Sequence, residues 1–79
     1  MNERRTANRQ RTLKAGTIIL NEGFSTIDCL VRNLSESGAR LEVDNPLTLP
    51  ERFELTLDGH RKACDVVWRS ARHVGIRFA

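Results

Sequence analysis

The chain reads Ala39-Arg40-Leu41-Glu42-Val43-Asp44 at its centre, an apolar and a charged side chain alternating at every step. A period of two is typical of a β-strand that buries one face and exposes the other to water. The turn formers Ser35-Glu36-Ser37-Gly38 precede this stretch, and Asn45-Pro46 follow it. The stretch therefore predicts a half-buried strand bounded by turns.

The same alternation recurs on both sides, with turn residues every eight to twelve positions. A first strand is expected from Thr12 to Leu20, and Asp58-Gly59 is a strong hairpin signal. The inward positions expected on the other strands are Ile27, Cys29 and Val31; Phe53, Leu55 and Leu57; Cys64, Val66 and Trp68; and Val74, Ile76 and Phe78. Together these patterns predict six strands, and helical periodicity is nowhere convincing.

Six half-buried strands without a helix to cover them are best accommodated by closing the sheet on itself. We therefore expect an all-β fold, a small six-stranded antiparallel barrel spanning residues 12–79, with no C-terminal helix after Phe78-Ala79. A chain of 79 residues holds a single core and no two-lobed active-site cleft. His60 and His73 lack a neighbouring carboxylate or nucleophile in the sequence, so no catalytic residues and no enzymatic activity are expected.

Residues 1–11 are expected to form a flexible basic arm. Met1 to Lys14 contains five basic side chains and one acidic side chain, whereas the remaining 65 residues contain eight basic and nine acidic ones. A segment with almost no apolar content cannot drive its own burial, so it should stay flexible until an anion orders it. A solvated tail, or non-specific attraction to nucleic acid or membrane, are the alternatives.

Cys29 and Cys64 stand alone, without a CxxC pattern or metal-spaced companions, and are interpreted as small buried hydrophobic residues. No metal or cofactor is expected. No apolar run is long enough for a membrane span, and the first residues do not resemble a secretion signal. The expected location is the cytoplasm.

Two segments of the sequence contain residues that a barrel fold does not by itself require. One is Arg4-Arg5-Thr6-Ala7-Asn8-Arg9, and the other is Asn33-Leu34-Ser35-Glu36-Ser37-Gly38. An Arg-x-x-x-Arg segment before the first strand, followed by an Asn-x-Ser-x-x-Gly turn in a six-stranded barrel, resembles the PilZ domain, the bacterial receptor for cyclic di-GMP. Val66-Val67-Trp68 and Val74-Gly75-Ile76-Arg77-Phe78 also resemble the closing strands of that family.

The resemblance implies a stand-alone receptor or adaptor that binds cyclic di-GMP through Arg5 and Arg9 of the first motif and Asn33, Ser35 and Gly38 of the second. Arginine suits this ligand because its planar fork pairs with phosphate oxygens or with guanine O6 and N7. For Asn33 and Ser35 the alternative is capping of their own turn. Gly38 is expected to adopt a positive φ and to leave room for the ligand.

An arginine immediately before the first motif, here Arg4, implies by the same resemblance two stacked ligand molecules per chain. Arg40 and Arg69 are further candidates to extend the site from neighbouring strands. Binding should order the arm, and the signal should then pass to an unidentified downstream protein. Many members of the family continue into a C-terminal helix after the last strand, whereas this chain stops at Phe78-Ala79. Apolar surface at that end of the barrel is therefore expected to be exposed, which would favour a homodimer.

The rival hypothesis is a small nucleic-acid-binding barrel with a basic arm. Such proteins combine a basic groove with exposed stacking aromatics. Here Phe53, Trp68 and Phe78 fall on the expected inward faces, which leaves only Phe24, in a turn. Nucleic-acid binding is therefore disfavoured.

Overall fold

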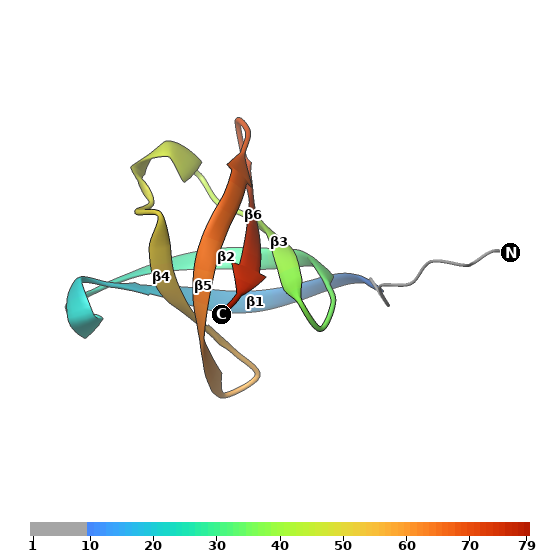
Figure 1. Ribbon diagram of the computed structural model, residues 1–79, viewed down its shortest axis with the longest axis horizontal. Helices are drawn as coiled ribbons and strands as arrows, with labels where there is room; N and C mark the ends of the chain where they lie inside the picture. The colour runs from blue at the N-terminus through green and yellow to red at the C-terminus, as the bar shows by residue number, and fades with distance from the viewer. Residues whose placement is uncertain (1–9) are drawn as a thin grey trace, which may run out of the picture.

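The computed structural model describes residues 10–79, which form six antiparallel strands closed into a barrel in the order β1-β2-β3-β6-β5-β4 (Figure 1). The strands are β1 (Gln10–Leu20), β2 (Ser25–Leu34), β3 (Gly38–Glu42), β4 (Arg52–Leu57), β5 (His60–Arg69) and β6 (His73–Phe78). Two single-turn 3-10 helices, η1 (Asn21–Gly23) and η2 (Pro46–Thr48), connect β1 to β2 and β3 to β4. The expected all-β barrel is confirmed, and no α-helix occurs among residues 10–79.

Strand β1 begins at Gln10, two residues before the expected start. It pairs with β2 along its length but with β4 only over Thr17–Ile19. The β1–β2 hairpin therefore extends beyond the closed part of the barrel, and its η1 tip projects past the other strands (Figure 1).

Side chains from all six strands fill the interior. The residues with no exposed surface include Ile18 on β1, Val31 on β2, Leu41 on β3, Leu55 on β4, Cys64 on β5 and Val74 on β6. Each aliphatic side chain buried in this way contributes roughly 1.5–3 kcal/mol to folding. The alternation recognised in the sequence therefore does specify the core.

Three register shifts interrupt the alternation. They lie on β1 between Arg11 and Lys14, on β2 between Val31 and Asn33, and on β5 between Val66 and Trp68. A bulge inserts an extra residue in one strand and so turns the following side chains to the opposite face. The expectation that Trp68 faces inward is wrong for this reason: the residue is 45% exposed.

The other two aromatic positions follow the sequence pattern more closely. Phe53 is buried, and Phe78 is partly buried and packs against the core. Lys62 lies 5.1 Å from the centroid of the Phe78 ring, a cation–π contact on the outer edge of the core.

Both cysteines are free and buried, as the sequence predicts. Burial raises the pKa of each thiol from 9.0 to about 11, and the nearby carboxylates of Asp28 and Asp65 add to the effect for Cys29 and Cys64 respectively. A thiol with a pKa well above neutral is a poor nucleophile. The cysteines therefore act as core side chains.

These pKa values predict a pH dependence of stability. Because the folded pKa exceeds the unfolded one, folding favours the neutral thiol. That contribution is complete below pH 9 and is lost as the pH rises from 9 towards 11. Urea denaturation should show a falling free energy of unfolding across this window, and the Cys29→Ala/Cys64→Ala double variant should show a shallower fall. An equal slope in both proteins would contradict the assignment.

Candidate functional site

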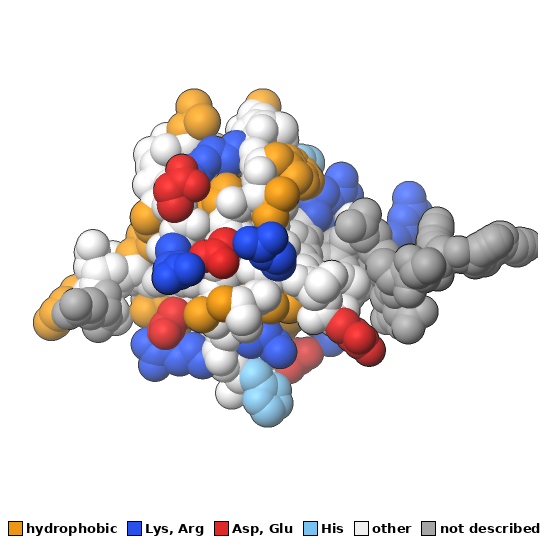
Figure 2. All heavy atoms as spheres, in the orientation of Figure 1, with side chains coloured by type: hydrophobic (Ala, Val, Ile, Leu, Met, Phe, Trp, Pro, Cys, Tyr) orange, Lys and Arg blue, Asp and Glu red, His pale blue; other side chains and the backbone are white. Residues whose placement is uncertain are grey.

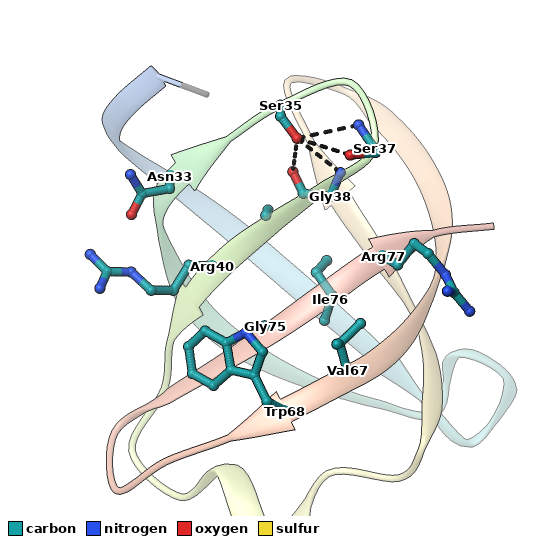
Figure 3. A pocket seen from close by; sticks show the side chains of 11 residues that line it. Asn33, Ser35, Ser37, Gly38, Arg40, Val67, Trp68, Gly75, Ile76 and Arg77 are labelled. Atoms are coloured by element: carbon teal, nitrogen blue, oxygen red, sulfur yellow. Dashed lines mark hydrogen bonds between the residues drawn. The ribbon is translucent and has the colours of Figure 1, made fainter. Parts of the chain in front are cut away.

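A pocket of about 420 Å³ lies on the outer wall of the barrel, over β3, β6 and β5 and beside the turn between β2 and β3 (Figure 3). Its lining includes Asn33, Ser35 and Gly38 of the turn motif. From the neighbouring strands it includes Arg40 and Trp68. The structure thus brings the second sequence motif together with two residues that lie outside it.

A row of paired residues crosses five strands at this pocket. Arg11 pairs with Asn33, Asn33 with Arg40, Arg40 with Gly75, and Gly75 with Trp68. Directly paired residues place their side chains on the same face of a sheet. The three bulges lie beside this row on β1, β2 and β5, so the irregularities of the barrel coincide with its pocket.

Trp68 lies against Gly75. A Cβ atom added to Gly75 would overlap the indole ring at Nε1, Cε2 and Cδ1 of Trp68. The ring therefore occupies the space that a side chain on β6 would need, and Gly75 itself is buried beneath it. Trp68 as a residue remains 45% exposed, and it lines the pocket (Figure 3).

Arg40 projects from β3 on the other side of Gly75 (Figure 3). Its Nε atom is buried and has no hydrogen-bond partner among residues 10–79. A buried donor without a partner costs on the order of 1–3 kcal/mol, more for a charged group, so such atoms call for an explanation. Arg40 is therefore a pocket-lining arginine with one donor that no described residue satisfies.

The Ser35 hydroxyl organises the turn. It accepts hydrogen bonds from the backbone N–H groups of Ser37 and Gly38 at 3.3 and 3.2 Å, and it lies 3.3 Å from the Gly38 carbonyl oxygen (Figure 3). The Ser37 carbonyl in turn accepts from the Phe78 N–H at 2.8 Å, which ties the turn to β6. The alternative weighed for Ser35, capping of its own turn, is present, and direct contact with a ligand stays a prediction.

Asn33 differs from Ser35 in this respect. No hydrogen bond from its side chain to another residue in the range 10–79 is found, and the amide points outward beside Arg40 (Figure 3). Asn33 therefore has its donor and acceptor groups available at the pocket.

Gly38 is needed for a different reason than expected. Its φ is not positive; among residues 10–79 only Gly23 and Gly59 of the glycines have a positive φ. A Cβ on Gly38 would instead overlap the backbone carbonyl oxygen of Ile76 on β6. The expectation of a positive φ is wrong, and the close approach of β3 to β6 is what requires glycine.

Arg69 does not extend the pocket. Its guanidinium donates to the carbonyl oxygens of Pro46 and Leu49 at 2.7 and 2.8 Å and lies 3.4 Å from a carboxylate oxygen of Glu51. These contacts hold the η2 segment against β5, because they provide a hydrogen-bond donor to two carbonyl groups that lie outside the strands. Arg69 is therefore committed to the η2 segment and does not line this pocket; a contribution to ligand binding is not proposed for it.

The arginines of the first motif, Arg4, Arg5 and Arg9, lie outside the described residues. The register of β1 nevertheless fixes where that segment joins the barrel. Gln10 pairs with Leu34, and Arg11 pairs with Asn33. The residue that follows Arg9 in the chain is thus a direct neighbour of the turn motif.

Charges elsewhere on the barrel are largely compensated. Figure 2 shows acidic side chains placed between basic ones on the face over β4 and β5. Asp65 lies 2.8 Å from Arg52 and 3.9 Å from Arg77, and Glu54 lies 2.7 Å from Arg61. This face offers no continuous basic track of the kind that follows a nucleic-acid backbone.

Residues 10–79 contain no group of three or more His, Cys, Asp or Glu side chains arranged to hold a metal ion. The same part of the chain contains no helix that is both long and apolar enough to span a bilayer.

Comparison with known families gives a match to the PilZ domain over residues 3–79. The chain belongs to the PilZ domain family. This family is known as a receptor for cyclic di-GMP and is a family of ligand-binding domains, not of catalysts. A search of curated proteins found no match. The PilZ match covers nearly the whole chain, including both motifs and the pocket strands.

Sequence reasoning missed Trp68 and underrated Arg40. The available signal was the pairing of a bulky aromatic with glycine in the two closing strands, because a tryptophan that folds over its neighbour needs a residue without a side chain there. That signal becomes readable only once the register of β5 against β6 is known.

Replacing Gly38 by alanine should destabilise the PilZ barrel by about 2–3 kcal/mol, because the added methyl group meets the backbone of β6, which cannot rotate away. Gly16→Ala is the matched control, since a Cβ there would meet only side-chain atoms, at 3.3 Å. Thermal denaturation should show a clearly smaller loss for Gly16→Ala. Equal losses would contradict the role given to the β3–β6 approach.

Ser35→Ala should loosen the turn and cost about 1 kcal/mol, because two backbone N–H groups lose their acceptor. Amide hydrogen exchange at Ser37 and Gly38 should accelerate in this variant. Ser37→Ala removes only the contact between the two hydroxyls at 3.3 Å and should leave those amides nearly unchanged. Unchanged exchange in Ser35→Ala would show that the hydroxyl does not hold the turn.

Proposed function

We propose that this PilZ domain is a cytoplasmic receptor or adaptor that binds cyclic di-GMP without covalent chemistry. The observation that carries the proposal is the register of Gln10 against Leu34, which joins the segment bearing Arg4, Arg5 and Arg9 to the barrel beside the pocket of Asn33. A ligand in that pocket can be contacted from the turn, from the barrel wall and from the arginine segment at once.

The chemistry of these residues matches the ligand. Cyclic di-GMP presents two phosphates and two guanines, and arginine pairs with either through its planar fork. In the proposal Arg5 and Arg9 hold phosphate or guanine edges, and the Asn33 amide pairs with a guanine edge. Ser35 and Gly38 shape the turn that presents Asn33, and in the proposal the ligand contacts them at the rim of the pocket.

Ordering of the arginine segment on binding is energetically feasible. Fixing six residues costs on the order of 6–12 kcal/mol of conformational entropy. Charge-assisted hydrogen bonds return about 1.5–3 kcal/mol each, so four to six of them suffice. Three arginines together with Asn33 can make that number. The proposal includes two stacked ligand molecules per chain, with Arg4 compensating the additional phosphate charge.

The signal then has to reach another molecule. Phe24 at the β1–β2 tip is 88% exposed and Leu47 in the η2 segment is 78% exposed, and both are apolar. Exposed apolar side chains of this size favour protein contacts. We propose these two positions as contact points for a downstream protein or for a second copy of the chain.

One observation favours the rival function, a barrel that binds single-stranded nucleic acid. Trp68 is exposed, contrary to expectation, and exposed aromatics near arginine serve as stacking platforms. The interspersed charges over β4 and β5 argue against it (Figure 2). The same binding experiment can separate the two functions.

Titration calorimetry of the full chain with cyclic di-GMP should show saturable binding, with about two ligands per chain if Arg4 acts as proposed. Arg5→Ala and Arg9→Ala should each weaken binding by at least about tenfold, since each removes charge-assisted hydrogen bonds. Arg72→Ala, an exposed arginine in the β5–β6 turn, is the matched control and should bind as the wild type does. Binding of single-stranded RNA without any heat from cyclic di-GMP would establish the rival function.

A further inference from the structure

We propose that Arg4 and Arg5 dock, in the absence of ligand, in a second groove of the barrel wall that Asp28 and Asp44 flank. This groove is separate from the pocket beside the β2–β3 turn. The contact itself does not depend on the proposed function. Its consequence, competition between the groove and cyclic di-GMP for the same arginines, rests on that function.

The groove has an apolar floor. Its volume is about 420 Å³, and it crosses β1, β2 and the end of β3. Residues 15–17, 28–30 and 42–44 line it and are called the groove residues; none of them lines the pocket beside the turn. Ala15 pairs directly with Leu30, and both are exposed, Leu30 by 39%. The aliphatic stem of an arginine packs well on such a surface.

Carboxylates stand around this floor, and no basic side chain is among the groove residues. Glu42 is already engaged, since it lies 2.5 Å from Arg32 and 4.0 Å from His73. Asp28 and Asp44 are exposed, and neither lies within ion-pair distance of a basic side chain among residues 10–79. The groove therefore offers two uncompensated negative charges beside apolar surface, which suits a cationic side chain with a long stem.

The N-terminal segment of this chain has the matching charge, since residues 1–9 carry three arginines against Glu3 alone. The segment is also joined to the barrel at one end of β1, so it meets the groove at a high effective concentration that a separate molecule lacks. Charge and connection together make residues 1–9 the occupant that the structure favours over a second copy or another protein.

The length of the segment selects which arginines reach the groove. The first groove residue, Ala15, lies five residues along β1 from Gln10, which is about 17 Å of strand. A chain that folds back from Gln10 covers about 3.3–3.6 Å per residue. Arg5 and Arg4, five and six residues before Gln10, can therefore come level with the groove. Arg9 is adjacent to Gln10 and cannot.

Docking in the groove would compete with ligand binding. Glu42 of the groove follows Arg40 of the pocket by two residues on β3, so the two sites are neighbours on one wall, but an arginine can occupy only one of them. Exposed ion pairs are weak, whereas hydrogen bonds from arginine to phosphate are strong, so the ligand wins at sufficient concentration. The apparent affinity is then lowered by the fraction of chains whose arginines are docked.

The contact is tested by nuclear magnetic resonance of the full chain without ligand. In Arg4→Ala/Arg5→Ala the amide signals of the groove residues should move from their wild-type positions. In Asp28→Asn/Asp44→Asn the amide signals of residues 3–6 should move in turn. The wild-type positions should not change on dilution, because the contact lies within one chain.

Matched controls separate the contact from a general effect of charge. Arg9→Ala also removes one arginine, and it should leave the groove signals in place. Glu54→Gln removes an outward carboxylate of β4 that does not line the groove, and it should leave the signals of residues 3–6 in place. Thermal denaturation of each variant checks that the barrel remains folded.

The competition is tested by adding cyclic di-GMP. At saturation the groove signals of wild type should move to the positions that they have in Arg4→Ala/Arg5→Ala. Calorimetry should show that Asp28→Asn/Asp44→Asn binds cyclic di-GMP about two- to fivefold more tightly than wild type, because the competing ion pairs are lost. Glu54→Gln should bind it as wild type does.

The outcomes distinguish this inference from the proposed function. Groove signals that were unchanged in Arg4→Ala/Arg5→Ala would overturn the contact, and signals that moved on dilution would assign the groove to a second copy instead. Saturable binding of cyclic di-GMP with unmoved groove signals would overturn the competition and leave the proposed function standing. No binding of cyclic di-GMP would overturn the proposed function and with it the competition, whereas the contact, measured without ligand, would stand.

Discussion

The close approach of β3 to β6 is the constraint on which the rest of the barrel depends. These strands are distant in the chain, and their pairing is needed to close the sheet. Gly38 permits the approach because any side chain there would meet the Ile76 carbonyl. The same two strands carry Arg40 and Gly75, so the seam that closes the barrel is also the floor of the pocket. One glycine of the turn motif thus serves stability directly and the site indirectly.

The pocket owes its remaining shape to departures from regular pairing. A closed barrel with perfect alternation would bury every second residue, including Trp68, and would present only the opposite set to solvent. Bulges on β1, β2 and β5 change the facing of residues at one level of the wall. Asn33 and Trp68 both follow a bulge and both line the pocket. The bulges disrupt some hydrogen bonds between neighbouring strands. They also align a row of outward-facing side chains that regular strands would not align.

The sequence was sufficient for the barrel, the buried cysteines and the place of the turn motif, because period-two alternation and turn residues are local properties. It did not predict the outward facing of Trp68, the reason for a glycine at position 38, or the contacts of Arg69. The facing of Trp68 depends on a bulge defined by the partner strand, and the need for Gly38 depends on backbone from the far end of the chain. Arg69 binds carbonyl groups of Pro46 and Leu49, which no side-chain pattern records. Each failure concerns a contact between segments far apart in sequence.

The charges of the barrel wall suggest why motif residues alone understate the site. Several arginines on described strands face a carboxylate: Arg32 with Glu42, Arg52 with Asp65, Arg61 with Glu54 and Arg69 with Glu51. Exposed pairs of this kind stabilise folding by no more than about 1 kcal/mol each, but they cancel the local attraction for anions. Arg40 is different, because its buried Nε has no acceptor within residues 10–79. The paired arginines are therefore committed to carboxylates of the barrel itself, whereas Arg40 is placed at the pocket with a donor that no described residue satisfies.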